Sequence, residues 1–342
     1  MTTNPGGAAH DGGRLGALIT GYNGTQVTRV IAELAIPDHL ADGPLSADDL
    51  ASATGTKAAP LRRLLSAALV YGLVTADDHD RFALTSLGGL LRTDVPGSMR
   101  PMAVGFTIAP LWQAFGALGD VVRTGQSVAA TVPGGLWEYF DSHSDDEVWF
   151  GRATSRFTTD LVAQIRAAGY APPPDARRIV DVGGGIGTVL ACLLDAAPSA
   201  HGVLFDRAEA LAGAPAVVAA VADRVEFVEG DFFESAPDGD VHVLASVLHN
   251  WSDDKAREIV ANCHQAARPG SSLIVIGLLL PPKPEPSLAY LMDLQMMVMM
   301  EGGRERTLAE HESLLAAEGY EFVRDVPIGE VMPAHVLEFR RR

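Results

Sequence analysis

The chain has little positive charge and no long apolar run, and each shortage excludes a class of protein. Its 26 lysine and arginine residues stand against 43 aspartate and glutamate residues, which gives a net charge of −17. Surfaces that bind nucleic acid need clustered Lys and Arg against the phosphates, so we expect no nucleic-acid partner. No stretch approaches the roughly 18 consecutive apolar residues of a membrane span, so we expect no membrane association.

Cysteine is also scarce. The only two, Cys192 and Cys263, lie in segments with helical periodicity. This count excludes a disulfide framework, predicts two buried small apolar side chains and favours a reducing compartment. Residues 1–14 are rich in Gly, Ala and Thr and lack the apolar core of a secretory signal, so they predict a disordered tail. The expected location is the cytoplasm.

Residues 15–105 have the pattern of a winged helix. Apolar residues recur at helical spacing from Leu15 to Ala35, a short helix is capped at Ser46, and another runs from about Ala58 to Tyr71. Two short strand-like runs then enclose the polar turn 76–80. Winged helices often bind DNA, but acidic residues outnumber basic ones here as well. A packing or dimerisation role is therefore favoured.

The rest of the chain predicts a helical connector over 106–175 and a Rossmann-like α/β domain over 176–342. Beyond a proline-rich break at 171–175, strand-like runs alternate with helical runs, which is typical of a mostly parallel sheet with helices on both faces. The seven predicted strands are Arg178–Val182, Gly202–Asp206, Val225–Val228, Val241–Ser246, Leu273–Leu279, Phe322–Ile328 and His335–Arg340. The last two follow a helix with a capping box at Thr307 and are candidates for a terminal antiparallel pair.

A glycine-rich turn follows the first of these strands. Gly183 and Gly185 come directly after its end, where a parallel strand presents ligands to the N-terminus of the next helix, and Asp181 can brace the turn. A dinucleotide fingerprint needs a third glycine at 188, but that position is Thr188 and the third glycine is Gly187. This spacing is the methyltransferase form. Alone, it could also be a plain tight turn.

The next two strands end in residues suited to an adenosine ligand. Asp206 can accept hydrogen bonds from both ribose hydroxyls, Asp231 can accept from an adenine amino group, and Phe232 can pack on the ring. Singly, these residues are equally well explained as solvated loop acids and a core phenylalanine. Together with the glycine-rich turn, these make three such strand endings in order along one sheet, and they predict S-adenosyl-L-methionine as the cofactor.

The fourth strand is followed by His249, which places an imidazole at the same sheet edge. Histidine has an ordinary pKa of about 6.5 and suits a base that accepts a proton from a phenol near neutral pH. A lone histidine is more often structural, so this assignment depends on its context. The ten histidines show no close ligand pairing, and we expect no metal site.

Several segments together resemble one family. They are 181–187, Gly230-Asp231-Phe232-Phe233, Leu248-His249-Asn250-Trp251-Ser252-Asp253 and Gly302-Gly303-Arg304-Glu305-Arg306-Thr307. With the winged helix, they are similar to the bacterial secondary-metabolite methyltransferases related to plant caffeate and flavonoid O-methyltransferases.

This resemblance covers nearly the whole chain and implies roles. His249 would be the general base and Glu305 its orienting carboxylate, in a homodimer that methylates a hydroxyl of a small aromatic substrate. The cofactor-binding residues it implies are Gly183, Asp206, Asp231 and Phe232, with the segment at Ser246 flanking the adenine.

The same resemblance bears on residues 288–300. Met292, Met296, Met299 and Met300 recur there at helical spacing, a pattern more often found in an ordinary core. In the family, however, this helix lines the acceptor site, which makes Met296 and Met300 candidate substrate contacts. Asp293 lies on another side of the helix and is a candidate buried hydrogen-bond acceptor.

Three positions depart from the plant pattern. Gly277 replaces a second acidic residue near the base, Ala245 replaces a lysine, and Asn250 replaces an aspartate and could offer an amide to the substrate. These departures leave open a diverged member with non-methylating chemistry, such as decarboxylation, hydroxylation or a pericyclic reaction. They also leave open methylation at N or C. An adenosyl-ligand sensor with a vestigial winged helix is a further alternative.

Overall fold

The computed structural model describes residues 5–127, 139–140, 142–329 and 333–342. The chain divides into a first unit, Met1–Gln113 with Phe140–Arg156, and a second unit, Ala114–Tyr139 with Phe157–Arg342. Helix α11 (Ser144–Ala167) contributes residues to both. No helix among the described residues is long and apolar enough to cross a membrane.

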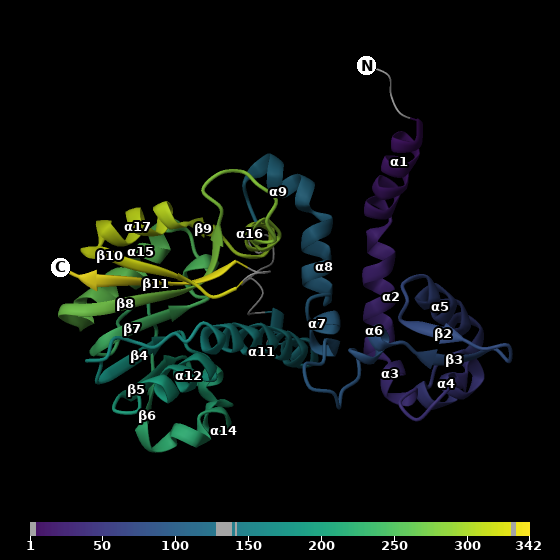
Figure 1. Cartoon of the computed structure of the whole chain (residues 1–342), viewed down its shortest axis with the longest axis horizontal. Helices are drawn as coiled ribbons and strands as arrows, with labels where there is room; N and C mark the ends of the chain where they lie inside the picture. Colours follow the sequence, from purple (N-terminus) through teal and green to yellow (C-terminus); the bar gives the residue numbers. More distant parts are fainter. Residues whose placement is uncertain (1–4, 128–138, 141, 330–332) are drawn as a thin grey trace. The chain divides into compact units, whose positions relative to one another are not determined.

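The first unit contains the expected helices followed by a hairpin (Figure 1). Its elements are α1 (Pro5–Ile19), α2 (Gly21–Glu33), α3 (Ile36–His39), β1 (Leu45–Ser46), α4 (Ala47–Thr54), α5 (Ala58–Val70), β2 (Val74–Ala76), β3 (Arg81–Leu84), α6 (Ser86–Gly89) and α7 (Arg100–Gly105). The strands pair in the order β1-β3-β2, all antiparallel. Ser46 caps α4 as predicted, because its hydroxyl accepts a hydrogen bond from the Asp49 N–H at 3.1 Å.

One expectation for the N-terminus does not hold. Helix α1 begins at Pro5, so residues 5–14 are helical where a disordered tail was expected. Extending an existing helix costs less than nucleating a new one, and α1 runs on from a segment that is itself strongly helical. The helical region expected over Leu15–Ala35 is present as two helices, α1 and α2, separated at Thr20, which has a ψ of 8°.

The second unit is built on an eight-stranded sheet. Its strands are β4 (Arg178–Val182), β5 (His201–Asp206), β6 (Val225–Glu229), β7 (Gly239–Ala245), β8 (Ala267–Leu280), β9 (Arg306–Thr307), β10 (Tyr320–Pro327) and β11 (Ala334–Arg341). The seven predicted strands pair in the order β10-β11-β8-β7-β4-β5-β6, with β10 and β11 antiparallel as expected. The two-residue β9, which the sequence did not predict, pairs with β8.

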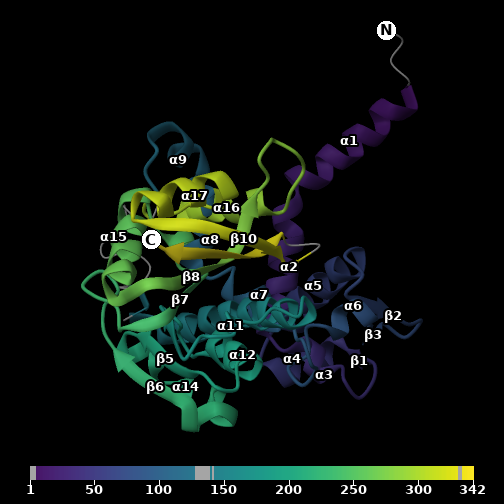
Figure 2. The same cartoon turned by 60° about the vertical axis from the view of Figure 1, so that its left-hand side comes forward.

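Helices cover both faces of this sheet, and Figures 1 and 2 show α12 and α14 on the face opposite α15 and α17. The helical elements are α8 (Ala109–Gly116), which begins in the first unit, α9 (Leu118–Thr124), α12 (Thr188–Ala196), α13 (Ala208–Leu211), α14 (Ala214–Val217), η2 (Ala219–Arg224), η3 (Leu248–Asn250), α15 (Asp253–Ala266), α16 (Ala289–Met299) and α17 (Leu308–Ala317). Separate apolar clusters fill the two faces, and Cys192 and Cys263 lie one in each, buried and unpaired.

The topology brings several chain segments to one edge of the sheet. The parallel strands β4, β5, β6 and β7 all end there, and the antiparallel β11 begins there. His335 of β11 is therefore paired directly with Gly277 of β8. Every segment that the sequence marked as functional in the Rossmann-like domain follows one of these strand ends or lies beside them.

Candidate active site

A histidine and a glutamate form a hydrogen-bonded pair at this edge. His249 lies in the short turn η3 after β7, and its Nδ1 is 2.8 Å from Oε1 of Glu305. The Glu305 side chain is only 3% exposed, whereas that of His249 is 21% exposed. Because a carboxylate can only accept, Nδ1 carries the ring proton and Nε2 is left as the proton acceptor. The structure thus joins the two residues predicted to be catalytic, which are 56 positions apart.

The segment that carries Glu305 is held by backbone contacts on both sides. The Arg304 N–H donates to the His249 carbonyl at 2.8 Å. The Glu305 N–H donates to Oδ1 of Asp293 on α16 at 2.9 Å, so Asp293 is the hydrogen-bond acceptor that the sequence suggested. Burial raises the pKa of Asp293 above its ordinary value, while this backbone bond opposes the rise. Helix α16 is thereby tied to the backbone of Glu305.

A buried arginine next to Glu305 holds the turn that carries His249. Arg306 is 1% exposed, and its guanidinium donates to the carbonyls of Leu248 at 2.8 Å and Trp251 at 2.9 Å. It also donates twice to Oδ1 of Asp253, at 2.9 and 2.8 Å. The sequence placed this arginine in a motif but did not indicate its role, since its partners lie more than fifty positions away.

The glycine-rich turn after β4 is tightly packed on one side and open on the other. Gly183 has a φ of 71°, a conformation that favours glycine, and Gly187 has a φ of 81° at the N-terminus of α12. A Cβ added to Gly184 would lie 2.6 Å from Cγ of Asp181. A Cβ added to Gly185 would meet no atom within 4 Å.

Two acidic residues lie against this turn. Asp181 is fully buried beneath it, and burial, reinforced by the charge of Asp206, raises the pKa of Asp181 to about 7. Asp206, at the end of β5, accepts a hydrogen bond from the Gly185 N–H at 2.8 Å. The predicted ribose carboxylate is thus bonded to the turn itself.

The predicted adenine-side residues lie after β6. Phe232 approaches the turn closely, because a Cβ added to Gly183 would be 3.3 Å from its ring. Its carbonyl accepts from the Asn262 amide at 2.9 Å, and the Asp231 carboxylate accepts from the Phe233 N–H at 2.8 Å. Sequence reasoning did not identify Asn262, which bonds this loop to α15.

The segment between β7 and η3 contains a strained residue. Ser246 has a φ of 55°, a conformation that costs energy for any residue but glycine and that is often found at functional sites. Its N–H donates to the Ile276 carbonyl at 2.8 Å, and its own carbonyl accepts from the Asn250 amide at 3.3 Å. One of the two amide hydrogens of Asn250 is therefore used in a hydrogen bond to the backbone.

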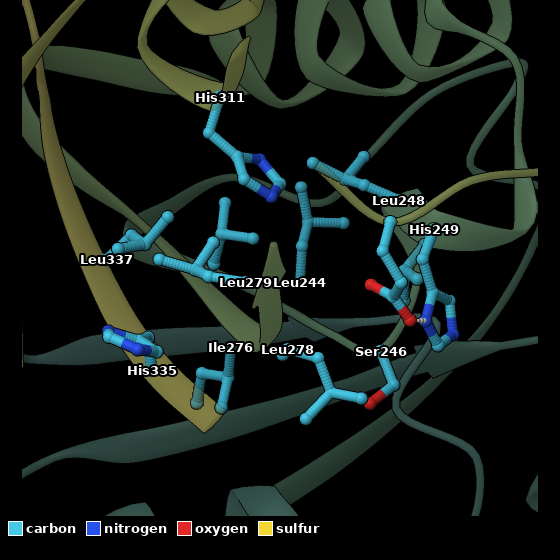
Figure 3. Close-up of a pocket in the computed structure, with 14 residues that line it drawn as sticks. Leu244, Ser246, Leu248, His249, Ile276, Leu278, Leu279, His311, His335 and Leu337 are labelled. Atoms are coloured by element: carbon cyan, nitrogen blue, oxygen red, sulfur yellow. Dashed lines mark hydrogen bonds and ion pairs between the residues drawn. The ribbon is translucent and has the colours of Figure 1, made fainter. Parts of the chain in front are cut away.

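A small cavity with a volume of about 20 Å³, partly open to solvent, lies beside the His249–Glu305 pair (Figure 3). His249, Glu305 and Ser246 line it, together with Gly277 and His335. Met296 and Met300, the predicted acceptor contacts, do not line this cavity. Met296 is 4% exposed, as in an ordinary core, while Met300 lies just beyond α16 and is half-buried.

The described part of the chain contains no group of three or more His, Cys, Asp or Glu side chains arranged to hold a metal ion. The three histidines that line the cavity, His249, His311 and His335, therefore do not form such a group.

Comparison with known proteins identifies two regions. Residues 115–321 match the model of the O-methyltransferase domain, and residues 17–94 match that of the O-methyltransferase dimerisation domain. The chain is 35% identical to a phenazine O-methyltransferase of Lysobacter antibioticus, with 91% of each chain covered.

Solved structures agree with these matches. The mitomycin 7-O-methyltransferase MmcR has a TM-score of 0.90 at 31% identity, with 99% of this chain and 100% of that chain covered. An O-methyltransferase from neocarzinostatin biosynthesis, solved with S-adenosylmethionine and a hydroxylated naphthoic acid, has a TM-score of 0.78 at 29% identity, with 94% and 96% covered.

Proposed function

This chain belongs to the O-methyltransferase family, and on that premise we propose that it transfers a methyl group to a hydroxyl of an aromatic secondary metabolite, with His249 as general base. The family makes the chain an enzyme that uses S-adenosylmethionine. The observation that carries our proposal for the site is the His249–Glu305 pair, located at the sheet edge where the glycine-rich turn also lies. The roles of individual residues and the acceptor class are the proposed parts.

The residues after β4, β5 and β6 fit S-adenosylmethionine. The open side of the turn at Gly185 leaves backbone accessible to a ligand, while Gly183 brings the backbone close to Phe232. The N–H groups of Gly185 and Arg207 each donate to one oxygen of Asp206, and the carboxylate keeps further lone pairs for ribose hydroxyls. Asp231 and Phe232 would contact the adenine, with Ser246 flanking it. When bound, the cofactor supplies an electrophilic methyl group on its sulfonium.

The catalytic pair would act on the proton of the acceptor hydroxyl. Glu305 holds Nδ1–H of His249, so the lone pair on Nε2 can accept that proton as the oxygen becomes nucleophilic. The buried Glu305 carboxylate then faces an imidazolium and stabilises its charge. Arg306 and Asp293 fix the two partners, which keeps the base at one distance from the acceptor.

Acceptor contacts are proposed around this base. Asn250 retains a second amide hydrogen and its carbonyl for a polar group of the substrate. We keep Met300 and Met296 as acceptor contacts on the family resemblance, with Met300 the more accessible of the two.

We also propose that the protein acts as a homodimer in the cytoplasm. The chain contains the O-methyltransferase dimerisation domain. In helices α1 and α2 of that unit, Leu15, Leu18, Ile19 and Tyr22 are each more than half exposed. A second copy of the chain would cover this apolar surface. The two unpaired cysteines fit a reducing compartment.

The test is methyl transfer from labelled S-adenosylmethionine to a panel of phenols, with an arylamine included and product mass recorded. His249→Ala should lower turnover by roughly 10²- to 10⁴-fold with little change in affinity for S-adenosylhomocysteine. Glu305→Gln keeps an acceptor for Nδ1 but loses the charge, and should lower turnover by roughly 10- to 100-fold.

His201→Ala is the matched control, because His201 is exposed and begins β5 at the opposite edge of the sheet. Turnover in His249→Ala equal to that of the control would contradict the base assignment. Transfer to the arylamine alone, or a mass change without label in the product, would contradict the proposed acceptor chemistry.

A further inference from the structure

A second histidine–carboxylate pair lies in the same cavity as the first. His335 at the start of β11 has its Nδ1 2.7 Å from Oδ1 of Asp325 on β10. The side chains of His335 and Asp325 are 19% and 25% exposed. The arrangement repeats that of His249 and Glu305, in which a carboxylate also holds Nδ1 at 2.8 Å. Among the residues that the structure describes, none hydrogen-bonds Nε2 of His335.

The strand register places this second pair next to the first. Ala245, at the end of β7, pairs with Ile276 of β8, and the following β8 residue, Gly277, pairs with His335 of β11. His249 follows β7 by four residues, so both histidines lie along one edge of three neighbouring strands. Figure 3 shows them on opposite sides of the cavity that both line.

Gly277 leaves space between the two pairs. A Cβ added at this position would meet no atom within 4 Å, apart from its chain neighbours. The backbone there is ordinary strand, so glycine is not required for its conformation. The missing side chain therefore enlarges the cavity at a point flanked by His335 and close to the catalytic pair.

We propose that the space over Gly277 is a polar subsite in which His335, oriented by Asp325, accepts a hydrogen bond from a second hydroxyl of the aromatic acceptor. The carboxylate holds the proton on Nδ1, so Nε2 offers a lone pair to a donor. A hydroxyl suits this subsite better than a carboxylate group, because Asp325 and Glu305 would repel a further negative charge. His335 is then a specificity-determining residue that selects acceptors with two hydroxyls. This inference rests on the proposed function.

The test compares 1-naphthol with the isomeric dihydroxynaphthalenes. Methyl transfer gives kcat/KM for each compound, and calorimetry on the protein loaded with S-adenosylhomocysteine gives its Kd. For the wild-type protein, at least one diol should exceed 1-naphthol in both quantities. His335→Leu should lower this diol-to-naphthol ratio by roughly 5- to 50-fold, because one hydrogen bond is lost.

Further variants separate the subsite from a structural effect. His335→Gln keeps an acceptor near the same place and should restore part of the ratio. Gly277→Val fills the space while leaving His335 intact, and should lower the ratio as well. His201→Leu, at the opposite edge of the sheet, is the control that should leave it unchanged.

The outcomes are distinguishable from failure of the proposed function. If no naphthol receives label, the proposed acceptor chemistry fails, and the ratio of Kd values still tests the subsite. A wild-type protein that binds no diol better than 1-naphthol overturns the subsite. So does a His335→Leu protein that keeps the wild-type ratio.

Discussion

Replacing Arg306 by alanine tests whether the buried guanidinium holds the turn that carries His249. The change removes hydrogen bonds to the carbonyls of Leu248 and Trp251 and to the carboxylate of Asp253. The Leu248 carbonyl accepts in a buried contact and would lose a charged donor, at a cost of about 1.5–3 kcal/mol. The Asp253 side chain is 46% exposed and can be rehydrated, so its share is small. We expect a total loss of about 3 kcal/mol in the free energy of unfolding.

Arg304→Ala is a closely matched control. Arg304 lies two residues away, pairs with Asp253 and with Glu310, and its side chain is 40% exposed. Exposed ion pairs contribute about 0–1 kcal/mol each and commonly near the lower end, so we expect the control to lose about 1 kcal/mol. Urea unfolding followed by circular dichroism measures both variants, and turnover is measured at a temperature where both are folded.

Turnover separates positioning from simple stability. Arg306→Ala should lower kcat more than it weakens binding of S-adenosylhomocysteine, because the hydrogen bonds that are lost hold the turn that carries His249. Equal unfolding free energies for the two arginine variants, or an unchanged kcat in folded Arg306→Ala, would contradict the role of Arg306 in holding the turn that carries His249.

Two further predictions concern the glycine-rich turn. The pKa of Asp181, about 7, is above its ordinary 3.8, so between these values the folded protein binds more protons and its unfolding free energy falls as pH rises. Asp181→Asn should abolish that fall, which amounts to up to about 4 kcal/mol between pH 4 and 8. If the unfolding free energies of the wild-type protein and the variant, measured by denaturation, change with pH in parallel, the prediction is contradicted. Gly184→Ala should destabilise the fold by about 1–3 kcal/mol, because its Cβ would lie 2.6 Å from Asp181 Cγ. Gly185 has open space but a φ of 57°, so Gly185→Ala should destabilise the fold by about 1–2 kcal/mol and should mainly weaken S-adenosylhomocysteine binding. If calorimetry shows that Gly184→Ala weakens this binding more than Gly185→Ala does, the assignment of Gly185 to the cofactor site is contradicted.

Features that depend on a few neighbouring residues were predictable from the sequence. The N-cap at Ser46, the capping box at Thr307 and the strand Arg178–Val182 appear where the sequence placed them. The capping interactions join residues three positions apart, so they need no partner from elsewhere in the chain. The disordered tail was predicted wrongly because residues 5–14 extend the helical segment that begins at Leu15, and extending a helix costs less than nucleating one. The strand β9 was missed because two residues form no periodic pattern.

The same distinction between local and long-range features applies to the candidate site. The sequence alone determined the residue types and their order along the strands, because carboxyl ends of parallel strands must share an edge. The pairing of Glu305 with His249 was expected only from the family resemblance, and the structure contains it. The tertiary structure alone showed that Arg306 bonds to the Leu248 carbonyl and that His335 lies opposite Gly277. These contacts depend on strand order and register. Strand order and register are set by the simultaneous burial of both faces of the sheet, and a local sequence pattern does not contain that information.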